Sequence, residues 1–246
     1  MTDLDGDWRA RGLTMCPDVE AGRWITESVR NFEHDVGSLV PPVFAAYARV
    51  FHPAELVTGP GPTDRRIVRW RDVAAANGAV AHPAMEWGSI VGSWDASGQP
   101  ELWDSAPEVG LLPASEARAL AMVLADFTAT PDACRLALCE ILNVLDVPPG
   151  IERLHLPARP MVLFCGPLSA ADARFSSFGH GPSLWWPDDR SWCVATDVDL
   201  MTTYVGGGAG CVRAIVECPD LEALPVPDTQ KVTWDSDSVN PLPTPP

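Results

Sequence analysis

The sequence is short of positive charge. Its 246 residues include 17 lysines and arginines against 33 aspartates and glutamates, a formal net charge of −16 at pH 7, and Lys231 is the only lysine. Nucleic acids and anionic membranes are bound largely through basic side chains, so this composition disfavours both as partners. A basic protein is the partner that the charge would attract, although acidity also serves simply to keep a protein in solution.

Long apolar runs and paired cysteine motifs are also missing. No stretch approaches the roughly 18 apolar residues of a membrane-spanning helix, and the charged first eleven residues do not resemble a secretory signal. The seven cysteines are an odd number and include no CxxC pair. We therefore expect reduced, mostly buried thiols in a cytoplasmic protein, with no metal site and no cofactor.

The familiar catalytic motifs are absent as well. The sequence contains no GxSxG elbow, HExxH pair, EF-hand loop or kinase signature, and it has no internal repeat. Its five histidines are scattered, and no local pattern points to one of them as a general base. No sequence motif therefore indicates a particular catalytic reaction.

What the chain does have is the composition of a folded protein. Hydrophobic residues make up 46% and charged residues 20% of it, enough to bury a full core. We expect a loosely ordered leader at residues 1–22, a single domain at residues 23–226 and a flexible, proline-rich tail at residues 227–246.

Apolar periodicity predicts an α+β fold, in which a mixed or antiparallel sheet carries helices mainly on one side. The predicted strands are residues 43–52, 65–70, 161–165 and 191–200. The predicted helices are residues 24–36, 72–76, 115–127, 130–145, a short one at 169–175, and 208–218. The helices at 115–127 and 130–145 are expected to form an antiparallel pair.

The most distinctive segment, residues 184–199, holds three of the ten tryptophans around a predicted hairpin turn. The turn has Pro187 at its first central position. Trp185, Trp186 and Trp192 flank it, and Arg190 would add charge or stacking to an aromatic recognition surface. The indoles are equally well explained as core anchors at the edge of the sheet, and both interpretations remain open.

The strand at residues 191–200 ends in two carboxylates on one face. Asp197 and Asp199 lie about 7 Å apart if the strand is regular. At that distance they suit a divalent cation with further ligands, or an acid/base pair. An ordinary solvated strand end is the more frequent explanation. Cys193, on the same face, is a third candidate for chemistry if a histidine lies near it in space.

Tyr204, Gly206 and Gly207 come shortly before the predicted helix at residues 208–218. Free amides at a helix N-terminus form a reasonable anion site. The spacing matches neither GxGxxG nor a Walker loop, and glycines before a helix more often just permit a tight turn. We therefore favour the turn.

Three stretches, residues 47–54, 184–199 and 203–207, resemble a family of actinobacterial proteins that share a WWPxDRxWCVATxxDxxxTYVGG-type motif. The resemblance extends over residues 24–226. It implies a lineage and a cytoplasmic setting, and it carries no activity, cofactor or site residue.

Two hypotheses about function follow. The favoured one is a non-catalytic binding protein, one version being an immunity-type protein that neutralises a basic toxin. Its binding residues would be Trp185, Trp186, Arg190, Trp192, Tyr204, Gly206 and Gly207.

The alternative is an enzyme acting on a small molecule in a cleft between the sheet and the loop from Trp87 to Trp103. Asp197, Asp199 and the Gly206 and Gly207 amides would supply acid/base and anion-binding groups there. The observation that separates the two is whether the carboxylates line a concave pocket or point into bulk solvent. The sequence does not define the oligomeric state.

Overall fold

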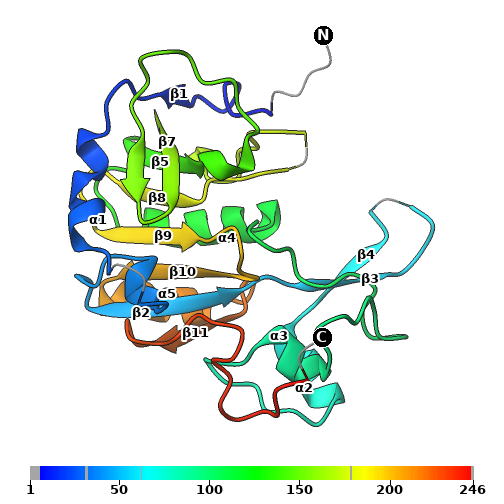
Figure 1. Cartoon of the computed structure of the whole chain (residues 1–246). Coiled ribbons are helices and arrows are strands. Elements are labelled where there is room, and N and C mark those ends of the chain that lie inside the picture. The colour runs from blue at the N-terminus through cyan, green and yellow to red at the C-terminus, as the bar shows by residue number, and fades with distance from the viewer. Residues whose placement is uncertain (1–5, 31–32, 62, 178, 245–246) are drawn as a thin grey trace.

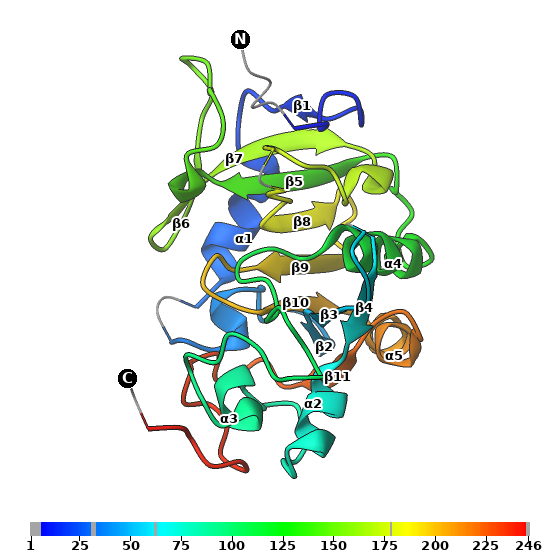
Figure 2. The same cartoon turned by 90° about the vertical axis from the view of Figure 1, so that its right-hand side faces the viewer.

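A nine-stranded sheet forms the body of the protein. The structure is a computed structural model that describes residues 6–30, 33–61, 63–177 and 179–244. The strand order is β1-β7-β5-β8-β9-β10-β2-β11, with β6 paired to β7, and Figure 2 shows the strands stacked in this order. The strands are β1 (Thr14–Met15), β2 (Ala46–Phe51), β5 (Cys134–Cys139), β6 (Leu154–Leu156), β7 (Arg159–Gly166), β8 (Leu184–Pro187), β9 (Trp192–Thr196), β10 (Thr202–Gly207) and β11 (Ala223–Val226).

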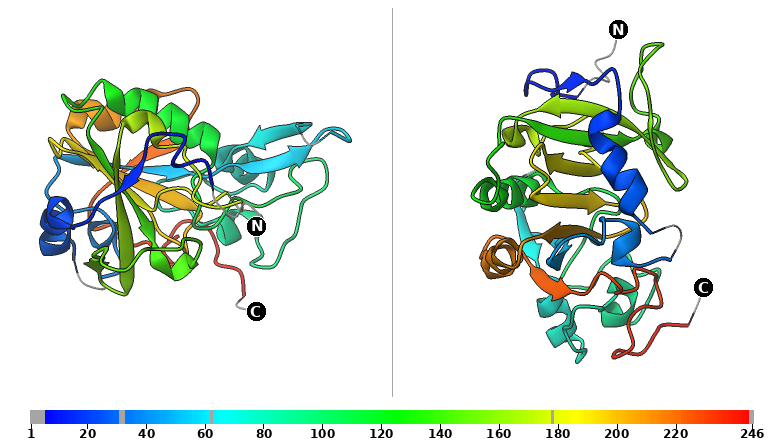
Figure 3. Two further views of the ribbon diagram at one scale, coloured as in Figure 1. Left: turned by 90° about the horizontal axis from the view of Figure 1, so that it is seen from above. Right: turned by 90° about the vertical axis from the view of Figure 1, so that its left-hand side faces the viewer.

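The α+β prediction is confirmed, and the strand pairings of the described sheet are antiparallel. The helices are α1 (Arg23–Ser28), α2 (Trp70–Ala76), α3 (Trp87–Val91), α4 (Ala114–Ala125) and α5 (Ala209–Glu217). The two longest, α4 and α5, cover one face of the sheet, and α1 lies on the other face (Figure 3). The helices therefore lie mainly on one side, as expected.

The sheet has a core on each face. On the α4 side, Ala117, Leu120, Ala121 and Leu124 form one buried helical stripe over the sheet, and Val194 is among the strand residues in the same cluster. On the α1 side a second cluster includes Ile25, Trp186 and Ala195. Because both faces are covered, the central strands are buried on both sides.

A smaller lobe is built beyond the end of β2. The strands β3 (Ala54–Val57) and β4 (Arg65–Val68) form a separate antiparallel pair that extends away from the sheet in Figure 1. Below it, α2 and α3 enclose a third apolar cluster that includes Trp70, Trp87 and Trp103. Two of the three tryptophans in residues 82–113, Trp87 and Trp103, are thus packed into this lobe.

Three helix predictions differ from the structure. Residues 134–139, placed in a helix at 130–145, form β5, which lies between β7 and β8 in the sheet. Burial on both faces of a central strand hides the alternation that identifies a strand, so the apolar spacing resembled a helix. The helix expected at residues 24–36 ends at Ser28, and Val29 is extended. Of the region predicted as a helix at 169–175, only residues 168–170 form a helical turn.

Residues 6–22 and 227–244, the described parts of the expected leader and tail, contain buried side chains. In the described part of the leader, Trp8 is 3% exposed and Thr14 pairs with Cys165 across β1 and β7. In the tail, Asp237 is 3% exposed and accepts hydrogen bonds from the Nε2 of His82 and the backbone amide of Asn240. These segments pack against the domain.

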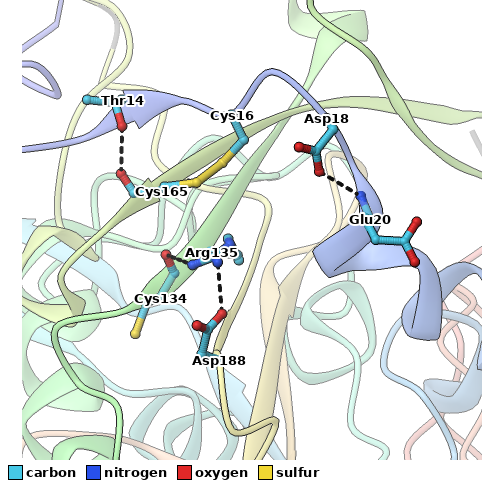
Figure 4. The surroundings of a disulfide bond; sticks show 8 residues. All are labelled: Thr14, Cys16, Asp18, Glu20, Cys134, Arg135, Cys165 and Asp188. Carbon is cyan, nitrogen blue, oxygen red and sulfur yellow. Dashed lines mark hydrogen bonds and ion pairs between the residues drawn. A yellow bond between two sulfur atoms is a disulfide. The ribbon is translucent and has the colours of Figure 1, made fainter.

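A disulfide joins Cys16 to Cys165, 149 residues away in sequence (Figure 4). The pairing of β1 with β7 brings the two together, and spacing alone does not reveal such a contact. The expectation of reduced thiols is wrong for this pair, which removes the argument that we based on thiols for a cytoplasmic setting. The free cysteines are Cys134, Cys139, Cys193, Cys211 and Cys218.

Within the described residues, no helix has the length and apolar character needed to cross a membrane.

Candidate functional site

The β8–β9 hairpin forms where it was predicted, but its turn is shifted by one residue. The amide of Arg190 donates to the carbonyl of Pro187 at 2.9 Å, so Pro187 is the first residue of the turn, not the second. The carboxylate of Asp189 accepts from the hydroxyl of Ser191 at 2.7 Å and from the amide of Ala129 at 2.7 Å. The turn is therefore tied to the loop that follows α4.

The three indoles of this hairpin are buried, so they do not form the exposed recognition surface that the sequence suggested. Trp185 and Trp186 are 1% exposed and Trp192 is 0% exposed. Trp185 and Trp192 face α4, with ring centroids 5.6 Å apart, and the Nε1 of Trp192 donates to the carbonyl of Leu124. Trp186 lies in the opposite core. The three tryptophans are therefore core residues, which is one of the two interpretations that the sequence left open.

Arg190 is the exposed member of the predicted set. Its guanidinium lies 5.5 Å from the ring centroid of Trp24, a cation–π contact at the surface. Because the indoles of the hairpin itself are buried, only Arg190 and the half-buried Trp24 remain at this position of the surface.

Tyr204, Gly206 and Gly207 lie within β10 and are buried, so the amides expected at a helix N-terminus are in the sheet instead. Helix α5 starts only at Ala209. A Cβ added at Gly206 would lie 2.4 Å from Cδ2 of Phe44, so glycine is needed there for close packing. The predicted anion site is wrong, and so is its alternative of a tight turn at Gly206 and Gly207.

Cys193 does not fit a nucleophilic role. It is 0% exposed, and burial raises the pKa of its thiol. Because the thiolate is the reactive form, burial makes this cysteine unreactive.

Asp197 and Asp199 do line a concave pocket. They follow β9 at the end opposite the hairpin turn and border a cavity of about 230 Å³. Its apolar lining is Leu39, Leu156, Met161, Leu184, Leu200 and Val232. These residues come from five separate stretches of chain, and the cavity lies on the α1 side of the sheet, where Ala195 points.

Arg159 organises the polar wall of this pocket. Its Nε donates to Oδ2 of Asp197 at 3.0 Å, and its Nη2 donates to Oδ1 of Asp197 at 3.1 Å and to Oδ2 of Asp199 at 3.0 Å. The hydrogen bonds that Arg159 donates to Asp197 raise the pKa of this guanidinium. The amide of Asp199 also donates to Oδ1 of Asp197 at 3.0 Å. Both oxygens of Asp197 are thus occupied, whereas the side chain of Asp199 is 77% exposed.

A second arginine, Arg30, borders the pocket on the side of Ser38 and Leu39. Arg30 donates to Oδ2 of Asp35 at 2.7 Å and to the carbonyl of Asp228 at 2.9 Å, and it also pairs with the Asp228 carboxylate. His34 and Ser38 line the same wall. Through Arg30 the pocket wall is joined to the C-terminal segment, which supplies Val232.

A buried chain of hydrogen bonds lies behind the pocket. Nδ1 of His52 is 2.8 Å from the carbonyl oxygen of Glu108, which only accepts, so Nδ1 carries the proton. Nε2 then accepts from the hydroxyl of Thr203 at 2.9 Å, and Thr203 accepts from the hydroxyl of Thr196 at 2.7 Å. Burial lowers the pKa of His52 to about 4, so the imidazole is neutral. Thr196 also borders the cavity.

This arrangement suits binding better than proton transfer or metal binding. Asp197 is committed to Arg159 and to the turn, and Arg159 lies between the two carboxylates where a cation would have to sit. Among the residues that the structure describes, no three histidine, cysteine, aspartate or glutamate side chains are grouped to hold a metal ion. What remains is a shaped apolar cavity with one accessible carboxylate.

Sequence reasoning located Asp197 and Asp199 but missed their partner. Arg159 lies 38 residues before Asp197 and stands in no recognisable motif. Arg30 and Val232 come from opposite ends of the chain. No local signal identifies these residues, because only the fold brings them together.

No family model, no curated protein and no solved structure matches the chain. The resemblance to an actinobacterial family therefore stays a prediction.

Proposed function

We propose that this protein binds a small molecule in the pocket bordered by Asp197 and Asp199, and that it acts by binding and not by catalysis. One observation carries the proposal: an apolar cavity on the α1 side of the sheet has a wall of two carboxylates that Arg159 holds in place. Ligand sites in proteins are typically concave and mainly apolar, with few polar groups that fix orientation.

The size of the cavity limits the ligand. Pockets for drug-sized ligands occupy roughly 300–1,000 Å³. A cavity of about 230 Å³ is smaller, so we expect a compact ligand with one apolar body, the size of a single ring with a short chain.

A binding role agrees with the first hypothesis from sequence but moves it to another surface. The proposed partner changes from a basic protein to a small molecule, because the indoles that were to hold a protein are buried. The enzyme hypothesis keeps its two carboxylates at a cavity, but the loop from Trp87 to Trp103 does not line that cavity, and the expected chemistry is lost. Its thiol is buried, its glycine amides lie in β10, and Asp197 is paired on both oxygens.

The test is a thermal-shift screen of small amphipathic compounds, because a ligand of the native state raises the melting temperature. Hits are then measured on Val232→Trp, which enlarges a half-buried side chain that lines the cavity. The matched control is Val239→Trp, since Val239 is 55% exposed and does not line this pocket.

We expect the hits to lose their effect on Val232→Trp and to keep it on Val239→Trp. Chemical shifts of the backbone amides of Leu184 and Ala195 provide a second measurement that needs no variant. A screen without hits, or hits that neither variant nor these amides respond to, contradicts the proposal.

A further inference from the structure

The ligand class follows from the charges around the pocket, provided that the proposed binding function is correct. Both oxygens of Asp197 already accept hydrogen bonds: Oδ2 accepts from Arg159, and Oδ1 accepts from Arg159 and from the amide of Asp199. Asp197 therefore positions Arg159 and the start of the turn.

Asp199 has an oxygen to spare. Its Oδ2 accepts from Nη2 of Arg159, and among the described residues we find no hydrogen-bond donor to its Oδ1. The side chain is 77% exposed and borders the cavity. A carboxylate held by one oxygen, with the other directed to solvent, is a fixed acceptor at the mouth of the pocket.

Negative charge exceeds positive charge on both sides of the cavity. Arg159 is shared by Asp197 and Asp199, which leaves that wall with one surplus negative charge. Arg30 is likewise shared by Asp35 and Asp228. Lys231, the neighbour in sequence of the lining residue Val232, is exposed, and its ammonium donates to the carbonyl of Glu33. The net charge of −16 for the whole chain adds to this field.

We infer that the ligand is a small amine, whose ammonium group binds Asp199 while its apolar body lies against Leu184, Met161 and Leu200. An ammonium supplies both the positive charge that the surplus carboxylates favour and the donors that Asp199 lacks. A ligand carboxylate would have to approach Arg159, whose charge two aspartates already compensate.

The test compares three probes with the same ring and similar length: phenethylamine, 2-phenylethanol and 3-phenylpropionate. Their dissociation constants are measured by ligand-observed NMR at pH 7, at low salt and again at high salt. We expect the amine to bind about five- to tenfold more tightly than the alcohol, and the carboxylate to bind most weakly. Salt should weaken only the binding of the amine, because it screens an exposed charge pair.

Variants then assign the effect to Asp199. Asp199→Asn keeps the shape of the side chain and removes its charge, so the preference for the amine over the alcohol should disappear. Asp95→Asn is the matched control, because Asp95 is exposed and does not border this pocket. It should leave all three dissociation constants unchanged.

The outcomes separate this inference from the proposed function. If the alcohol and the carboxylate bind as tightly as the amine, and Asp199→Asn changes nothing, the amine assignment is wrong while the binding pocket stands. If Mg²⁺ alone raises the melting temperature through Asp199, the site is a cation site and the assignment is again wrong. If neither these probes nor the wider screen bind, the proposed function itself fails.

Discussion

Strand β9 is stabilised in opposite ways at its two ends. At its start, Trp192 is fully buried under α4 and packs edge-on against Trp185. At its end, the hydroxyl of Thr196 joins a polar chain to His52, and the next residue, Asp197, is paired with Arg159. One end is held by apolar packing and the other by hydrogen bonds and charge.

The difference explains why tryptophan content was a poor guide to function. Indoles bury large apolar surfaces, and in a sheet covered on both faces they serve as core residues. A binding site instead needs side chains that remain accessible, and here those lie at the polar end of the strand, around Asp199. The two ends should therefore respond differently to mutation, to pH and to ligands.

The largest effect is expected at the apolar end. Trp192→Ala removes a fully buried indole and its hydrogen bond to the carbonyl of Leu124. We expect it to lower the free energy of unfolding by about 3–5 kcal/mol, as large-to-small core substitutions do. The measurement is a urea or guanidinium unfolding curve at pH 7.

The control for this prediction is Trp234→Ala. Trp234 is 57% exposed and contacts Trp94 edge-on, so we expect a loss below about 1 kcal/mol. Equal effects of the two substitutions, or a stable Trp192→Ala protein that has lost its ability to bind a protein partner, would restore the recognition-surface hypothesis.

The sequence was a good guide where the pattern was local. Alternation identified β9, a helical stripe identified α4, and the position of Asp197 and Asp199 after a strand was correct. It was a poor guide where the outcome depended on what covers a segment. The apolar run of β5 resembles a helix until it is placed between two other strands.

For the same reason, long-range contacts could not be predicted from local sequence patterns. Nothing near Asp197 in sequence points to Arg159, and nothing near Cys16 points to Cys165, 149 residues away. The candidate site could thus be located at one end of β9, but neither its positive charge nor its apolar lining could be predicted.

Lowering the pH is expected to have an intermediate effect on the free energy of unfolding, through His52 at the polar end of β9. His52 has a pKa of about 4 in the folded protein and about 6.5 when unfolded, so the unfolded chain binds the extra proton between these values. The stability that the neutral imidazole contributes is complete above pH 6.5 and is lost as the pH falls toward 4. The shift corresponds to about 3 kcal/mol, which unfolding curves at pH 7 and 4.5 should largely reveal.

Substitution of His52 measures how much of this pH dependence of stability is due to this histidine. His52→Gln should be less stable at pH 7 and should lose less stability between pH 7 and 4.5 than the wild type. His155→Gln is the control, because His155 is exposed, and it should retain the wild-type dependence. His180, whose pKa burial also lowers, contributes to the remaining slope in both variants. An unchanged slope in His52→Gln contradicts the assignment.

The smallest effect on stability, and the sharpest contrast, is expected between the two neighbouring carboxylates. Asp197→Asn disrupts a two-pronged ion pair and a hydrogen bond within the turn, and it should lower the free energy of unfolding by about 1 kcal/mol. Asp199→Asn changes an exposed side chain and should stay within about 0.5 kcal/mol of the wild type. For the affinity of the amine we expect the opposite order, with the larger effect from Asp199→Asn, because Oδ1 of Asp199 is the oxygen that can bind the ligand. The Asp199→Asn protein should lose the preference for the amine and remain as stable as the wild type. A destabilised Asp199→Asn protein would mean that this carboxylate has a structural role. The polar end of β9 would then, like the apolar end, serve only to stabilise the fold.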